Sequence, residues 1–61
     1  MFKIGTTYNL KFRESSGREH TVMNCTVVNY DEVNGLLKVD QAGKEIIFMI
    51  RNITFHSAEI S

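Results

Sequence analysis

The alternation of hydrophobic and polar residues predicts an all-β chain. Between residues 8 and 13, Tyr, Leu and Phe alternate with Asn, Lys and Arg, which is typical of a strand with one buried face. No segment keeps a helical period over about 11 residues. Related patterns recur downstream, and we therefore expect four further strands at residues 20–30, 36–40, 45–50 and 53–60.

Turn residues separate the predicted strands. Ser15-Ser16-Gly17 marks the first turn, Asn34-Gly35 the second and Ala42-Gly43-Lys44 the third. Glycine and asparagine tolerate the left-handed backbone that tight hairpins require. Arg51-Asn52 forms a brief interruption before the last strand. Short strands joined by such turns predict an antiparallel arrangement.

The second predicted strand changes its apolar face midway. Met23, Cys25 and Val27 share one face and are expected in the core, whereas Val28 and Tyr30 continue the apolar pattern on the other face. A β-bulge or a sharp bend produces such a change. Because a bent second strand lets a short sheet curl onto itself, we expect a small, strongly bent, five-stranded antiparallel β-barrel.

The fourth predicted strand is apolar on both faces. Ile47 and Met49 lie on one face, opposite further apolar residues, and no charge interrupts the run. A barrel has only one interior, so the face of Ile47 and Met49 must contact something else. Phe2 and Ile4 could cover this face or one end of the barrel. Alternatively, the face could contact another subunit or a protein partner, and we favour self-association.

Composition limits both fold and function. A chain of 61 residues buries only about 60% of its unfolded surface, so we expect one domain with little stability to spare. Seven basic and seven acidic residues give no net charge, which argues against non-specific nucleic-acid binding. A single cysteine excludes an internal disulfide. We expect a cytoplasmic protein, since we find one thiol, no signal peptide and no apolar run of about 20 residues.

No pattern in the sequence indicates catalysis. The chain has no glycine-rich phosphate loop, paired-carboxylate motif or nucleotide fingerprint. Cys25 lies among apolar residues and is expected to be a buried, inert thiol. With His20 and His56 it cannot make a four-ligand zinc site of the Cys/His type. We therefore expect a protein that is not an enzyme and holds neither a metal nor a cofactor.

The middle of the chain resembles the Sm-like proteins. Gly17-Arg18-Glu19 opens the second strand, and Tyr30-Asp31-Glu32-Val33-Asn34 precedes an apolar third strand, as in the first motif of that family. Ile50-Arg51-Asn52-Ile53 resembles the second motif, in which a basic residue and a glycine link the last two strands. The likeness covers about residues 10–60. It departs from the family in the spacing of the first motif and in lacking an N-terminal helix.

The resemblance implies a pocket for an RNA base at one end of the barrel. Tyr30 would stack on the base, Asp31 and Asn34 would read its edge, and Arg51 would clamp sugar or phosphate. Asn52, which stands where the family has glycine, would complete this candidate binding loop. The alternative is that Asp31 and Asn34 cap their own turn while Tyr30 covers an edge of the core.

Taken together, these patterns predict a non-enzymatic small β-barrel that self-associates and binds a protein partner through strand edges and loops. Its candidate oligomer or partner face is Ile47 and Met49. Two alternatives remain open. One is an Sm-like RNA-binding subunit, and the other is a purely structural, assembly or inhibitor protein.

Overall fold

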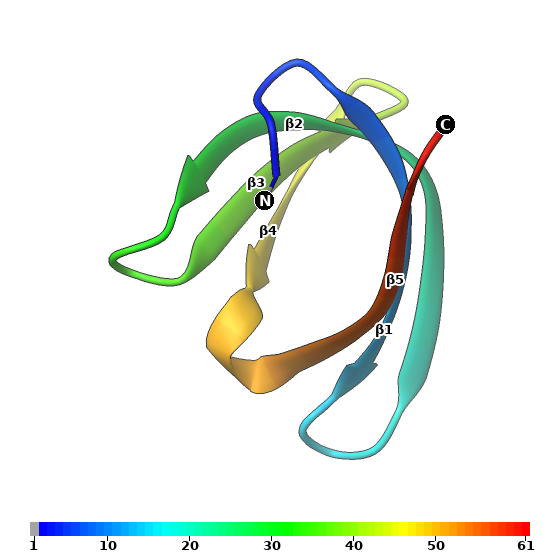
Figure 1. The fold of residues 1–61 in the computed structure, drawn as a ribbon, viewed down its shortest axis with the longest axis vertical. Coiled ribbons are helices and arrows are strands. Elements are labelled where there is room, and N and C mark those ends of the chain that lie inside the picture. The colour runs from blue at the N-terminus through cyan, green and yellow to red at the C-terminus, as the bar shows by residue number, and fades with distance from the viewer. Residues whose placement is uncertain (1) are drawn as a thin grey trace.

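A computed structural model describes residues 2–61 and shows one five-stranded antiparallel sheet (Figure 1). A short 3₁₀ helix, η1, precedes the last strand. The sequence predicted every strand to within one residue at each end. The elements are β1 (Thr7–Glu14), β2 (Glu19–Asp31), β3 (Leu36–Gln41), β4 (Lys44–Met49), η1 (Ile50–Asn52) and β5 (Ile53–Ile60).

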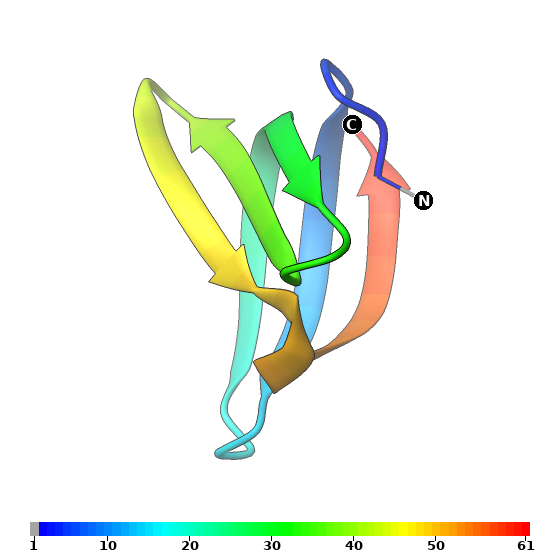
Figure 2. The ribbon, with the colours of Figure 1, turned by 90° about the vertical axis from the view of Figure 1, so that its left-hand side faces the viewer.

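The strand order β4-β3-β2-β1-β5 makes β4 and β5 the two edges of the sheet. Strand β2 serves both halves of the fold, because its first part pairs with β1 and its second part pairs with β3. It bends between the two parts, so that the sheet curves around its concave face (Figures 1 and 2). The predicted all-β, five-stranded antiparallel architecture is confirmed. The sheet formed by residues 2–61 is not closed into a barrel.

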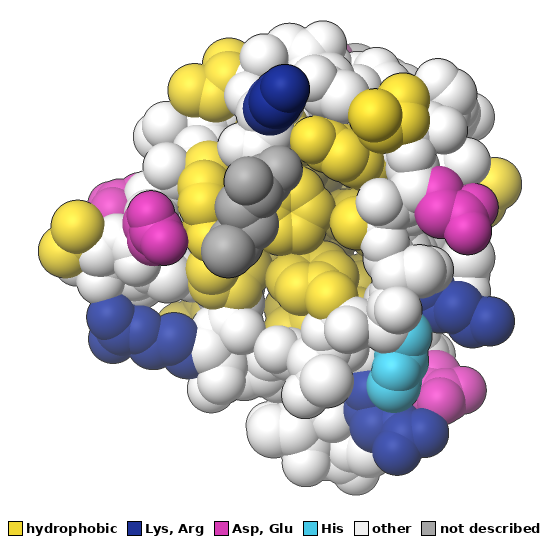
Figure 3. Space-filling model, in the orientation of Figure 1, with side chains coloured by type: hydrophobic (Ala, Val, Ile, Leu, Met, Phe, Trp, Pro, Cys, Tyr) yellow, Lys and Arg dark blue, Asp and Glu magenta, His cyan; other side chains and the backbone are white. Residues whose placement is uncertain are grey.

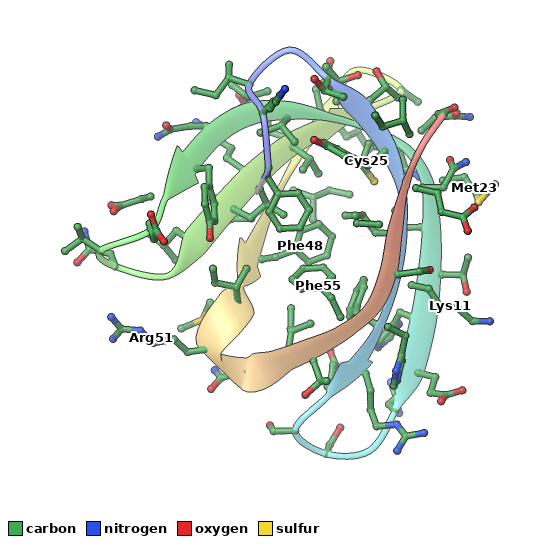
Figure 4. All side chains as sticks on the ribbon, viewed as in Figure 1. Lys11, Met23, Cys25, Phe48, Arg51 and Phe55 are labelled. Carbon is green, nitrogen blue, oxygen red and sulfur yellow. The ribbon has the colours of Figure 1, made fainter. Side chains whose placement is uncertain are left out.

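The hydrophobic core lies on the concave side of this curved sheet, and hydrophobic side chains are visible at its centre in Figure 3. Phe48 from β4 and Phe55 from β5 both point into it (Figure 4). Each packs edge to face on Phe12, with ring centroids 5.2 and 5.8 Å apart. The core therefore joins the two halves of the sheet. Its buried side chains are Tyr8, Leu10, Phe12, Cys25, Val27, Leu37, Val39 and Phe48.

Phe2 closes one end of this core. Its ring lies edge to face against Tyr8, Tyr30 and Phe55, with centroids 5.5, 5.6 and 5.3 Å away. Ile4 is 67% exposed. Of the two roles considered from the sequence, Phe2 therefore covers an end of the core, and Ile4 does not cover the outer face of β4.

The bend in β2 coincides with a shift in register. Pairing with β3 slips between Val27 and Asn29, where the apolar pattern of the sequence changes face. Val27 is buried and Tyr30 packs against the core, whereas Val28 between them is exposed. The irregularity predicted from the sequence is therefore present. The extra residue lets both parts of the strand turn apolar side chains into one core.

A second bulge in β2 makes one prediction wrong. Opposite Asn9 of β1 the strand holds two residues, Met23 and Asn24, and the backbone of Asn24 has φ +55°. The extra residue breaks the alternation of faces. Cys25 is consequently fully buried, whereas Met23 points away from the core and is 51% exposed (Figure 4). Met23 therefore does not belong to the core row expected from the sequence.

Candidate interaction surface

The loop between β2 and β3 lies against η1. Arg51 donates a hydrogen bond from Nη2 to the carbonyl oxygen of Val33 at 2.6 Å, and the Ile50 N–H donates to the Gly35 carbonyl at 2.9 Å. Gly35 has φ +70°, and a Cβ there would lie 3.0 Å from Cγ of Arg51. Glycine is therefore the residue that lets η1 approach this closely. The two segments that carry the candidate binding residues meet here.

Asp31 and Asn34 are bonded to each other within their own loop. Asp31 Oδ2 accepts a hydrogen bond from Asn34 Nδ2 at 2.7 Å, and Asp31 Oδ1 accepts one from the Asn34 backbone N–H at 3.1 Å. These donors favour the charged carboxylate and lower the pKa of Asp31. Tyr30 packs against Phe2 at the edge of the core. These contacts match the alternative in which Asp31 and Asn34 cap their own turn and Tyr30 covers an edge of the core.

Asn52 differs from the other candidate residues in its contacts. Its backbone carbonyl accepts a hydrogen bond from the Ser15 N–H at 2.9 Å, which links the end of η1 to the turn between β1 and β2. The structure therefore brings four of the five candidate residues together on or against the β2–β3 loop, whereas the contact shown for Asn52 is with the β1–β2 turn.

The outer face of β4 is apolar and uncovered. Ile47 and Met49 are each 59% exposed, so no segment of residues 2–61 buries them. Across the pairing with β3 they lie opposite Lys38 and Leu36. Lys38, directly across from Ile47, places its Nζ 3.6 Å from the Glu45 carboxylate, so this ion pair borders the apolar face. The face predicted from the sequence is therefore exposed in the chain as described.

The β3–β4 hairpin determines which backbone groups of β4 are free. Its two-residue loop, Ala42 and Gly43, has φ +52° and +84°, which is typical of a type I′ turn. The residues that flank such a loop form a hydrogen-bonded pair, and bonded residues then alternate along the strand. The N–H and C=O groups of Glu45, Ile47 and Met49 consequently point away from β3, toward the free edge.

A groove of about 630 Å³ runs along this free edge. Strand β4 forms one wall and the β1–β2 hairpin forms the other. Its lining is mainly apolar and aromatic, and it includes one carboxylate and no lysine or arginine. The lining residues are Phe12, Glu14, Ser15, Ser16, His20, Val22, Ile46, Ile47, Phe48, Met49, Asn52 and Ile53.

Glu14 and His20 form the polar end of the groove. The His20 ring stacks on Phe12 with centroids 5.2 Å apart. His20 Nε2 lies 3.3 Å from Glu14 Oε2 but lacks the alignment of a hydrogen bond, and this buried atom has no hydrogen-bond partner within residues 2–61. Ser16 Oγ donates a long hydrogen bond of 3.4 Å to Glu14. Glu14 is therefore a carboxylate with weak partners at the mouth of an apolar groove.

The groove was not foreseen from the sequence, although one of its walls was. The unequal lengths of two paired strands could have indicated the groove. Strand β2 has 13 residues and β3 has six, so β3 cannot pair with the whole of β2. The first part of β2 is left with a free side, which faces the free edge of β4 across the groove. His20 and Val22, which the sequence placed on a strand without a role, line this opening.

Residues 2–61 contain no group of three or more His, Cys, Asp or Glu side chains that could hold a metal ion. None of their helices has the length and hydrophobicity needed to cross a bilayer. Comparison with protein-family models, curated proteins and solved structures finds no match.

Proposed function

We propose that this chain is a non-enzymatic interaction module whose contact strand is β4. A second copy packs on the outer face of β4, and an extended strand of a protein partner docks along its free edge. The supporting observation is that Ile47 and Met49 present exposed apolar side chains together with backbone groups that point away from β3. Such an edge is a template for strand addition.

The contrast between the two edge strands supports this choice. The pairing of β5 with β1 contains a bulge at His56, and β5 carries the charged residue Glu59 near its end. Bulges and charges are the usual protection of sheet edges. Strand β4 carries Lys44 and Glu45 at its start, so each edge strand has charge near one end only. The difference is the bulge, because β4 pairs with β3 without any register shift and residues 46–49 form a regular, uncharged edge. The less protected edge is therefore β4. The strong curvature of the sheet supports the small β-barrel expected from the sequence (Figures 1 and 2).

The exposed area limits the strength of self-association. Burying an exposed Ile or Met side chain contributes about 1.5–3 kcal/mol, so completing the burial of Ile47 and Met49 contributes about 1 kcal/mol each. Two such pairs in a symmetric dimer give about 4 kcal/mol before the entropy lost on association is subtracted. A net binding free energy of that size corresponds to a dissociation constant of about 1 mM, so we expect association only at about millimolar protein or above.

Light scattering over a range of concentrations tests the second copy. The apparent mass should rise above 7.0 kDa as concentration increases. Ile47→Lys should restore the monomer, because it places a charge on the contact face. Ile60→Lys, which alters an apolar side chain on β5 that is 73% exposed against 59% for Ile47, should associate like the parent. A parent chain that stays monomeric at millimolar concentration, or equal association of both variants, would contradict the proposal.

RNA binding by the β2–β3 loop is the second candidate function. It is supported by the position of Arg51, which bonds to Val33 in the loop that begins after Tyr30 and Asp31 and contains Asn34. A labelled uridine- or adenosine-rich oligonucleotide, titrated at low salt, should then bind the parent and bind Arg51→Ala and Tyr30→Ala weakly. Equal binding by these variants, or no binding at tens of micromolar, would reject it.

A further inference from the structure

We infer that the groove beside β4 binds an extended peptide segment with apolar side chains and a lysine or arginine near one end. This rests on the proposed function, because it names the chemistry of the strand that docks at that edge. The groove volume of about 630 Å³ lies within the usual range of ligand sites, about 300–1,000 Å³.

The arrangement of the walls favours a single extended segment. The free edge of β4 lies on one side of the groove. On the other side stands the first part of β2, which pairs only with β1 because pairing with β3 begins at Thr26. If a folded copy of this chain paired along β4, its own neighbouring strand would lie on the side of the groove where the β1–β2 hairpin stands. A lone peptide strand meets no such obstacle and finds backbone hydrogen-bonding groups along β4.

The lining of the groove selects apolar side chains. Alternate side chains of a docked strand point to opposite faces. Those that point inward would contact Phe12, Val22 and Phe48, and those that point outward would lie beside Ile47 and Met49. Side chains on either face of the docked peptide would therefore have hydrophobic neighbours.

Charge complementarity selects the basic residue. Glu14 is the one carboxylate that lines the groove, and no Lys or Arg of residues 2–61 lies within 4.0 Å of it. Its partners are the long hydrogen bond from Ser16 and the poorly aligned imidazole of His20. A lysine or arginine at this end of the peptide would supply the missing cation beside the Glu14 carboxylate, whose side chain is 45% exposed.

Three kinds of short synthetic peptide, all of alternating valine and threonine, test the inference. The first carries lysine at its first or last position, the second carries glutamate there, and the third is the lysine peptide with N-methylated backbone amides. We expect the lysine peptide to bind about fivefold more tightly than the glutamate peptide, as for an ion pair at a partly exposed site. This preference should vanish in Glu14→Gln, and N-methylation should abolish binding.

Two variants separate the possible failures. Ile47→Pro removes an N–H that faces the free edge and is not needed for pairing with β3, so it should lose peptide binding while Ile60→Lys retains it. Binding that resists both N-methylation and Ile47→Pro would overturn edge docking and with it the proposed function. If edge docking holds but lysine and glutamate peptides bind equally, or Glu14→Gln keeps the preference, the inferred basic residue is wrong. No binding by the lysine peptide also overturns the inference.

Discussion

Replacing Phe2 with alanine should remove much of the folding free energy, although Phe2 precedes the first strand. Its ring is partly buried and packs on three other rings, those of Tyr8, Tyr30 and Phe55. Truncating a fully buried phenylalanine costs about 3–5 kcal/mol, and the partial burial of Phe2 reduces this to about 2–3 kcal/mol. A core of this size rarely supplies more than about 3–5 kcal/mol. The variant should therefore be only marginally folded.

Urea and thermal unfolding, followed by circular dichroism, measure this loss. For a domain of this size each kcal/mol shifts the midpoint by about 4–8 °C, so Phe2→Ala should lower it by about 10–20 °C. Ile4→Ala is the matched control, because Ile4 is 67% exposed and its truncation should cost no more than about 0.5 kcal/mol. If Phe2→Ala and Ile4→Ala lower the free energy of unfolding by the same small amount, Phe2 does not close the end of the core.

Three further predictions concern the loops and the core. In urea unfolding, Gly35→Ala should lower the free energy of unfolding by about 1 kcal/mol more than Gly43→Ala does. Both glycines have positive φ, but only at Gly35 would an added Cβ contact Arg51 of η1, at 3.0 Å. Equal losses would contradict the close approach of η1. Hydrogen bonds from Asn34 lower the pKa of the Asp31 carboxyl in the folded chain. The Asp31 carboxylate therefore stabilises the loop fully above about pH 3.9, the pKa of an ordinary aspartate. This stabilisation is lost as the pH falls through the lower pKa of Asp31 in the folded chain. An NMR titration of the Asn34 amide should show a midpoint below that of ordinary aspartate, and a midpoint at or above it would contradict the pairing. Burial raises the pKa of the Cys25 thiol, which should therefore resist a thiol reagent at mildly alkaline pH until denaturant unfolds the chain. Rapid reaction of the native protein would place Cys25 outside the core.

Local chemistry explains why the strands could be predicted. Turn residues and period-two alternation act within a few positions, and the change of face after Val27 reveals the bulge at Val28 directly. The bulge at Asn24 leaves no such trace, because Met23, Cys25 and Val27 alternate as a regular strand would. Whether the curved sheet closes depends on contacts between its two edges, which alternation along the chain does not encode.

The candidate site divides in the same way. Exposure of Ile47 and Met49 follows from a strand that is apolar on both faces, so the sequence was enough to identify that surface. The groove depends on the unequal lengths of β2 and β3 and on the position of the β1–β2 hairpin, which are properties of the assembled sheet. The sequence left two roles open for Asp31 and Asn34, and only the coordinates show their mutual hydrogen bonds.

Amide hydrogen exchange along β4 tests the central claim most directly. In dilute protein, the amides of Ile46 and Phe48 should exchange slowly because they bond to β3, while those of Ile47 and Met49 should exchange quickly at the free edge. Saturation with the lysine peptide should slow exchange at Ile47 and Met49. Protection of these two amides in the dilute protein, or fast exchange that persists when the peptide is bound, would contradict the assignment of β4 as the contact strand.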